Sequence, residues 1–122
     1  MQISEAESQV MEVLWQRHPQ AADEVIAALS ARTDWAEPSI KTLLNRLLRK
    51  GAIQADRDGR RYLYSPRLQR QDWLAQQSES FVDRLFGGRV APLVAHFSDQ
   101  RKLSAKDIAE LKRLIAEIED GD

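Results

Sequence analysis

The chain of 122 residues contains no cysteine and only two histidines, His18 and His96. The absence of cysteine excludes disulfide bonds, thiolate metal ligands and a cysteine nucleophile. The two histidines lie beside Pro19 and Phe97, without the spaced partners that a zinc site or the general base of a nucleophile requires. We therefore expect no metal site, no cofactor and no enzymatic activity.

Long apolar runs and glycine-rich loops are missing as well. No stretch approaches the roughly 18 apolar residues of a membrane span. The opening MQISEAESQV is acidic and amphipathic, whereas a signal peptide has a basic segment followed by an apolar run. The pair Gly87-Gly88 stands alone, which is more typical of a hinge than of a phosphate-binding loop. These absences predict a soluble, cytoplasmic protein that is not inserted in a membrane.

Charge is nearly balanced over the whole chain but not along it. Lys and Arg number 18 against 19 Asp and Glu, and 43% of the residues are hydrophobic. Residues 1–37 carry two basic and seven acidic side chains, whereas residues 38–66 carry seven basic and two acidic ones. The composition predicts one compact domain, or a small domain with an appendage, with its positive charge concentrated in the middle of the sequence.

Apolar residues in the first part of the chain recur at helical spacing. Ser4 and Glu7 match a capping box, and they predict a helix from residue 4 to 17 that stops before Pro19. A second helical pattern covers residues 21–31. The strongest pattern begins at Pro38 and ends at Gly51, residue types typical of helix starts and ends. Three helices are therefore predicted before residue 52.

From Ile53 to Ser65 the apolar residues alternate with a period of two, which predicts a β-hairpin around the dipeptide Asp58-Gly59. Counting outward from this turn predicts the cross-strand pairs Arg57 with Arg60, Asp56 with Arg61, Ala55 with Tyr62, and Ile53 with Tyr64. Both tyrosines are then expected on the core-facing side. Three helices followed by a hairpin is the order of a winged helix-turn-helix, to which we assign residues 1–66.

In the second half of the chain, the spacing of apolar residues predicts a helix between Arg67 and Phe86, a short one between Val90 and Phe97, and a last one from Ser104. Each has a single apolar stripe, which an isolated helix cannot bury. We therefore predict that residues 67–122 form a helical dimerisation domain. Its interface is expected to contain Trp73, Leu74, Phe81, Leu85, Leu93, Phe97, Ile108, Leu111, Leu114, Ile115 and Ile118. The alternative is that the same stripes form a small bundle within one chain.

Seven basic residues form a block that coincides with the third helix and the hairpin, the elements that meet DNA in winged-helix proteins. The members of this basic block are Lys41, Arg46, Arg49, Lys50, Arg57, Arg60 and Arg61. The third helix carries a polar row at i, i+3, i+4 and i+7, formed by Thr42, Asn45, Arg46 and Arg49. Side chains of these types recognise base edges, while Ser39, Lys41, Arg57, Arg60 and Arg61 are expected on the phosphates. Two alternatives remain, namely an ordinary solvated helix face and a winged-helix protein-interaction module without specific DNA binding.

Several segments also resemble a known family in order and spacing. They are SEAESQVMEVLW, ADEVIAAL, DWAEPSIKTLLNRLLRKGAI, GRRYLYSP, SFVDRLFGG, LVAHF and LSAKDIAELKRLI. Over nearly the whole chain they resemble the penicillinase repressor family, the BlaI/MecI/CopY-type transcriptional regulators. The resemblance implies a mainly α-helical homodimer with a small β-hairpin wing. Such a dimer represses resistance or stress genes, among them β-lactamase genes, from palindromic double-stranded operators, which in the best-known members contain TACA and TGTA half-sites.

The resemblance also implies roles for individual residues. Thr42 and Arg46 would reach base edges, and the backbone contacts would come from Ser39, Lys41, Arg49, Arg60 and Arg61. In antibiotic-responsive members a membrane-bound sensor protease leads to cleavage of an Asn-Phe bond in the dimerisation domain. The matching position here is His96-Phe97, which keeps the phenylalanine but not the asparagine. The cysteine-rich metal motif of the copper-responsive branch is absent.

Overall fold

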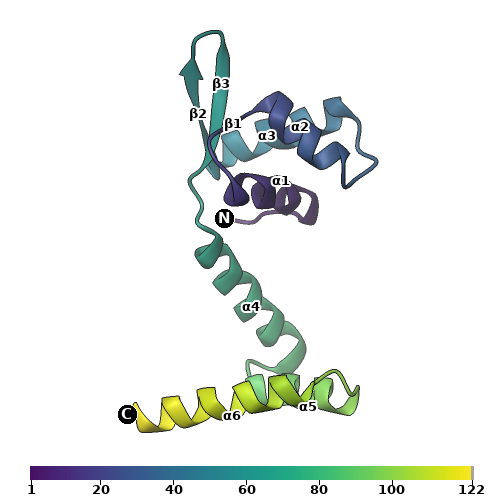
Figure 1. Cartoon of the computed structure of the whole chain (residues 1–122), viewed down its shortest axis with the longest axis vertical. Coiled ribbons are helices and arrows are strands. Elements are labelled where there is room, and N and C mark those ends of the chain that lie inside the picture. Colours follow the sequence, from purple (N-terminus) through teal and green to yellow (C-terminus); the bar gives the residue numbers. More distant parts are fainter. Residues whose placement is uncertain (122) are drawn as a thin grey trace. The chain divides into compact units, whose positions relative to one another are not determined.

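The computed structural model describes residues 1–121 (Figure 1). The chain consists of two compact units, Met1–Leu74 and Ala75–Asp122. The first unit contains α1 (Glu5–Gln16), β1 (Gln20–Ala21), α2 (Ala22–Ser30), α3 (Glu37–Lys50), β2 (Ile53–Asp58), β3 (Arg61–Pro66) and the start of α4 (Arg70–Phe86). The second contains the rest of α4, α5 (Val90–Asp99) and α6 (Ala105–Asp120). The predicted fold class, mainly helical with a winged helix-turn-helix, is confirmed.

The ends of the first helices form as the sequence indicates. The Ser4 hydroxyl accepts a hydrogen bond from the Glu7 amide at 3.1 Å, and the Glu7 carboxylate accepts one from the Ser4 amide at 3.0 Å. Pro38 lies in the first turn of α3, where its missing N–H costs nothing. Gly51 ends α3 with a φ of 79°, a left-handed conformation that favours glycine. The capping signals therefore located these helices correctly.

The core of the first unit lies between α1, α2, α3 and the base of the sheet. Its largest fully buried side chains are Met11, Leu14, Leu29, Ile40, Leu44, Leu47, Ile53, Val10 and Val25. One side of α3 packs into this core, because its buried residues Ile40, Leu44 and Leu47 are spaced by helical turns. The opposite side of α3 is consequently left in solvent.

The sheet has three antiparallel strands in the order β1-β3-β2, one strand more than predicted. The additional strand β1 has only two residues, Gln20 paired with Tyr64 and Ala21 paired with Leu63. Gln20 is buried, and its Nε2 donates a hydrogen bond to the carbonyl oxygen of Val13 at 3.0 Å. Two residues show no alternation of apolar and polar side chains, so hydrophobic periodicity could not reveal this strand.

The predicted register of the hairpin is wrong by two residues. The structure pairs Asp58 with Arg61, and Ala55 with Tyr64, so Gly59 and Arg60 form the turn. Gly59 has a φ of 65°, and no other residue of this turn has a positive φ. A glycine with positive φ in the first central position is typical of a type II′ turn, whereas the predicted Asp58-Gly59 turn would need a positive φ at Asp58 as well.

The expectation that both tyrosines face the core is correct only for Tyr64. Tyr64 packs against the core cluster, while Tyr62 is 50% exposed. A register shift of two residues keeps both rings on the same face of the hairpin but moves Tyr62 outward, opposite Arg57. The predicted pair of Asp56 with Arg61 is also absent, because Asp56 stands opposite Leu63.

The second unit contains the helices that the sequence predicts. Gly87 and Gly88, with φ of 59° and 79°, separate α4 from α5. α5 continues to Asp99, two residues beyond the expected end, and a capping box of Ser104 and Asp107 starts α6. None of the described residues of α4, α5 or α6 is buried. The apolar stripes therefore do not close a core within the chain, contrary to the intrachain-bundle alternative.

Candidate nucleic-acid interface

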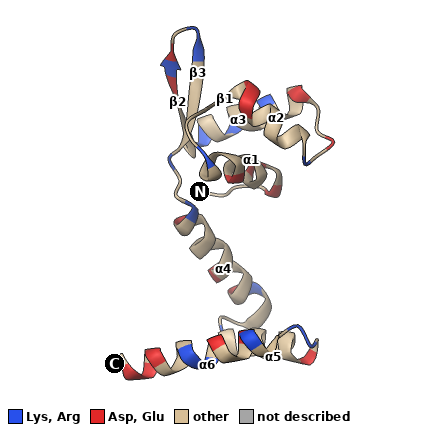
Figure 2. Ribbon diagram, viewed as in Figure 1, with Lys and Arg blue, Asp and Glu red and all other residues tan. Residues whose placement is uncertain are grey.

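The nine residues predicted to bind DNA are all exposed in the structure. Six lie on α3 outside its buried stripe, and three lie on the outer half of the hairpin. They are Ser39, Lys41, Thr42, Asn45, Arg46 and Arg49 on α3, with Arg57, Arg60 and Arg61 on the hairpin. Both groups belong to the first unit, which contains no part of α5 or α6. Figure 2 shows Lys and Arg in blue on the outer half of the hairpin.

The side chains in the middle of the α3 face are available for a partner. Within residues 1–121 no hydrogen bond or ion pair engages the side chains of Asn45, Arg46 or Arg49. The Thr42 hydroxyl donates to the carbonyl oxygen of Pro38 at 2.9 Å, which ties Oγ1 to the helix and leaves the methyl group for contacts. This face therefore offers an amide, two guanidinium groups and a methyl, which are the groups that recognise base edges in a major groove.

The flanking cations have only weak intramolecular partners. Lys41 Nζ lies 3.2 Å from Glu37 Oε1, and Arg61 Nε lies 3.9 Å from Asp58 Oδ2. All four groups are more than half exposed, so these ion pairs contribute little and a phosphate can replace the carboxylate. Arg57 Nε donates to the carbonyl oxygen of Gly59 at 3.1 Å, which holds Arg57 close to the tip of the wing.

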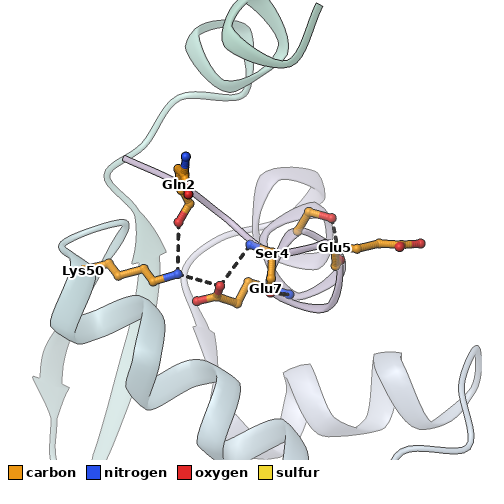
Figure 3. A network of polar contacts seen from close by, with 6 residues as sticks. Gln2, Ser4, Glu5, Glu7 and Lys50 are labelled. Carbon is orange, nitrogen blue, oxygen red and sulfur yellow. Dashed lines mark hydrogen bonds and ion pairs between the residues drawn. The ribbon is translucent and has the colours of Figure 1, made fainter. Parts of the chain in front are cut away.

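Lys50, by contrast, is engaged in contacts within the fold although the sequence places it in the basic block. Its Nζ lies 2.6 Å from Glu7 Oε1 and 3.0 Å from the carbonyl oxygen of Gln2 (Figure 3). Glu7 is only 2% exposed. The contact joins the last turn of the α3 helix to the first turn of α1, so this cation stabilises the fold. The two residues are 43 positions apart, and no local sequence signal connects them.

The electrostatics of this contact keep Glu7 ionised. Burial raises the pKa of Glu7, but hydrogen bonds from Lys50 and from the Ser4 backbone and side chain, together with the Lys50 charge, outweigh it. The net effect is a pKa below the ordinary value of 4.5.

The pKa of Glu24 is also lowered, first by the hydrogen bond from the Ala21 amide and then by Arg17 at 3.1 Å. Arg17 is therefore engaged by the start of α2.

An open hollow of about 380 Å³ adjoins the polar face of α3. It is lined by Ala6, Trp35, Ser39, Thr42, Leu43 and Arg46. Three of these residues belong to the predicted DNA-binding set, whereas Ala6 comes from α1 and Trp35 from the loop before α3. The polar side chains of α3 thus stand beside an apolar floor. Sequence reasoning missed Ala6 and Trp35, because their positions relative to α3 depend on the packed fold.

The residues predicted for a dimer interface divide between the two units. Several in the second unit are between 39% and 67% exposed, namely Phe81, Leu85, Phe97, Ile108, Leu114, Ile115 and Ile118. Leu93 and Leu111, together with Phe97 and Leu114, line an apolar hollow of about 290 Å³. Leu74 ends the first unit and is 39% exposed. Trp73 lies in the first unit, where its ring contacts that of Trp15.

The candidate cleavage residues His96 and Phe97 are both exposed and lie inside α5. The His96 ring stands 6.2 Å from Phe86 and 5.6 Å from Phe97, measured between ring centroids.

Within residues 1–121 no group of three His, Cys, Asp or Glu side chains is arranged to hold a metal ion. The same part of the chain has no helix long and apolar enough to cross a bilayer.

Three packed helices, an antiparallel wing and an exposed polar α3 define the class as a winged helix-turn-helix DNA-binding protein. The cations at the tip of the wing are the electrostatic feature expected of that class. More specifically, the chain belongs to the penicillinase repressor family, whose model matches residues 3–117. The family consists of transcriptional repressors, which is not an enzyme class.

Individual relatives agree with this assignment. The penicillinase repressor of Bacillus licheniformis is 35% identical over 116 residues, which cover 95% of this chain and 91% of that protein. The methicillin resistance regulatory protein MecI of Staphylococcus aureus (strain N315) is 29% identical over 114 residues, covering 93% of each chain. The similarity therefore extends over both units of the structure.

Two solved structures are similar to the first part of the chain. The solution structure of the DNA-binding domain of the repressor BlaI is 39% identical with a TM-score of 0.54, and the match covers 58% of this chain and 87% of that one. The monomeric form of Bacillus licheniformis BlaI in complex with the blaP half-operator has the same identity and TM-score, with coverages of 59% and 88%.

Proposed function

We propose that the protein is a homodimeric, cytoplasmic repressor that binds a palindromic operator, with one protomer on each half-site. Each α3 helix enters the major groove, and each wing lies along the adjacent backbone. The observation that carries this proposal is the unengaged polar face around Arg46, in a unit similar to one solved with a half-operator. The combination of base-reading side chains and flanking cations is what sequence-specific binding requires.

The roles of the side chains follow from their chemistry. Arg46 pairs with the O6 and N7 acceptors of guanine, and Asn45 with the N6 and N7 positions of adenine. The Thr42 methyl contacts a thymine methyl, since its hydroxyl is already bonded to Pro38. Ser39, Lys41, Arg49, Arg57, Arg60 and Arg61 hold phosphates and fix the register of the helix in the groove.

The second unit supplies the dimer contacts. Its helices contain no buried residue within the described chain, and their apolar side chains remain exposed on α4, α5 and α6. A second copy of the chain offers the same stripes, so a two-fold interface buries both sets at once. Linking two DNA-binding units in this way raises affinity for a dyad far above that for a half-site.

Release from DNA is proposed to follow cleavage at His96-Phe97 by a membrane-bound sensor protease. A cut inside α5 disconnects α6, with Ile108, Ile115 and Ile118, from the rest of the chain. The dimer interface is then weakened while the winged unit stays intact, and the proposed target, a β-lactamase or other resistance gene, is expressed.

The test is a selection of operator sequences by the full-length protein. The purified chain is incubated with a pool of random duplexes, with a TACA–TGTA dyad as reference, and the retained duplexes are sequenced after several rounds. The proposal expects an inverted repeat, and sedimentation of the complex should give two chains per duplex. A pool that remains random, or a complex with one chain on a single half-site, contradicts it.

A further inference from the structure

The beginning of α4 is fastened to α1 by contacts between residues far apart in sequence. The Trp15 indole Nε1 donates to the carbonyl oxygen of Leu68 at 2.9 Å. The rings of Trp15 and Trp73 meet with their centroids 5.4 Å apart, at an interplanar angle of 42°. Arg70 Nε lies 3.1 and 3.3 Å from the two carboxylate oxygens of Glu12. We call these five residues the tryptophan clamp.

The clamp is attached to a helix that is packed into the core. Glu12 and Trp15 are three residues apart on α1, so both project from the same side of the helix. The other side of α1 carries Val10 and Leu14, both fully buried in the core. Arg70 and Trp73 are likewise three residues apart on α4, so two neighbouring side chains of one helix meet two of the other.

The aromatic contact is the main part of the clamp. The Arg70–Glu12 ion pair is partly exposed, and pairs of that kind are individually weak. The Nε1 atom of Trp73 is buried without a hydrogen-bond partner among the described residues. Trp73 therefore acts through the packing of its ring, and a phenylalanine should replace it while an alanine should not.

Nothing in the sequence of α4 interrupts the helix after the clamp. α4 runs from Arg70 to Phe86 without glycine or proline, and its later residues belong to the second unit. The only glycines near its end are Gly87 and Gly88, where the helix stops. The first turn of the helix that leads to the proposed dimer interface is thus fixed on the DNA-binding unit.

We propose that the tryptophan clamp is a positioning device, which determines the half-site spacing that the dimer accepts. Trp73 is then a positioning residue of the winged unit. This inference rests on the proposed function, because a restraint on α4 affects DNA binding only when two winged units must engage one duplex. Without the clamp the two units still bind half-sites, but their effective concentration at a correctly spaced dyad is lower.

The experiment uses full-length variants and the dyad that the selection returns. Trp73→Ala removes the ring, and Trp73→Phe keeps an aromatic side chain. Arg70→Glu breaks the ion pair, and Arg70→Glu combined with Glu12→Arg reverses it. Gln71→Ala, at an exposed neighbouring position of α4, is the matched control. Each protein is titrated with the dyad, with an isolated half-site, and with dyads lengthened at the centre by one to three base pairs, and its self-association is measured by sedimentation.

The proposal expects Trp73→Ala to lose about tenfold in affinity for the natural dyad, with half-site affinity and self-association unchanged. Affinity of this variant should also vary less with spacing than that of the unmodified protein. Trp73→Phe and Gln71→Ala should behave like the unmodified protein. Arg70→Glu should cause a smaller loss of dyad affinity, which the reversed pair restores.

Other results overturn the inference in distinguishable ways. Equal losses for dyad and half-site would make the clamp only a part of the DNA-binding fold. Loss of self-association would place Trp73 in the dimer interface, and unchanged dyad binding would leave the clamp without a role. A protein that selects no duplex in the first place would contradict the proposed function itself.

Discussion

At the scale of single residues, two adjacent cations of α3 have different surroundings. Arg49 is exposed and has no intramolecular partner within residues 1–121, whereas the Lys50 ammonium is bound between Glu7 and Gln2. Counting charges in the sequence treats them alike. The difference arises because the last turn of α3 packs next to the first turn of α1, which depends on contacts across the fold.

The Lys50–Glu7 contact predicts a pH-dependent stability. Lys50→Met leaves the Glu7 carboxylate buried without its cation, so we expect the free energy of unfolding at neutral pH to fall by about 1–3 kcal/mol. The pKa of Glu7 is lowered in the folded protein. Its ionised carboxylate therefore contributes fully to the free energy of unfolding above the ordinary pKa of 4.5, and this contribution is lost as the pH falls through the folded pKa. Urea unfolding at several pH values measures this difference.

Glu7→Gln is the matched control for that series. It should make the unfolding free energy less dependent on pH below 4.5, since no carboxylate remains to be protonated. The gap between Lys50→Met and the unmodified protein should also narrow there. A gap that stays constant from neutral to acidic pH would show that the Lys50 charge does not stabilise Glu7.

Arg46 carries the second prediction at this scale. Arg46→Ala should reduce discrimination between the selected dyad and a scrambled duplex by about 1–3 kcal/mol for each half-site, because a bidentate contact to guanine is lost. Arg32→Ala is the control, since Arg32 donates to Gln16 on α1. Titrations by fluorescence anisotropy measure both. If discrimination is unchanged in Arg46→Ala, Arg46 does not recognise a base edge.

At the scale of elements, local signals in the sequence predicted the helices. They did not predict β1 or the register of the hairpin, because both depend on pairing across the sheet. Ser4, Pro38, Gly51 and Ser104 act within one turn of their own helix, so their effect is visible in the sequence. The hairpin register depends on which residue of the turn takes a positive φ, and β1 exists only because β3 is beside it. Neither can be derived from periodicity.

The exposed cations of the wing are expected to contribute to DNA affinity independently of the base sequence. Arg60 is exposed in the turn of the hairpin, so Arg60→Ala should weaken binding to the dyad and to a scrambled duplex alike. The slope of log affinity against log salt should decrease by about one for each wing, as expected when one phosphate contact is lost. Arg113→Ala on α6, where Arg113 pairs with Glu117, should leave the slope unchanged. A specific loss for the dyad alone would mean that Arg60 reads bases.

At the scale of the whole molecule, a net charge of −1 is combined with a strongly basic α3 and wing. The sequence alone predicted this charge separation and the exposed face of α3, because the buried stripe of a helix determines its opposite face. It did not reveal the intrachain contacts of Trp73 and Lys50, because apolar and basic residue types do not identify their tertiary partners. The structure places these two side chains against Trp15 and Glu7.

The exposed apolar face of α6 predicts the behaviour of the dimer. Ile115 is 54% exposed, so Ile115→Asp should be tolerated by the isolated chain, whereas burying the carboxylate in an interface is strongly unfavourable. We expect a monomer that keeps half-site binding and loses its preference for the dyad. Lys106→Asp, at an exposed position of the same helix, is the control. A dimeric Ile115→Asp protein would exclude this face from the interface.

The most direct test of the central claim is an anisotropy titration of the full-length protein. The probes are the selected dyad and a scrambled duplex of the same composition, each at low and high salt. We predict a clear preference for the dyad that persists at both salt concentrations, a stoichiometry of two chains per duplex, and lower affinity for both probes at high salt. Equal, weak binding to the two duplexes, or one chain per dyad, would contradict a dimeric, sequence-specific repressor.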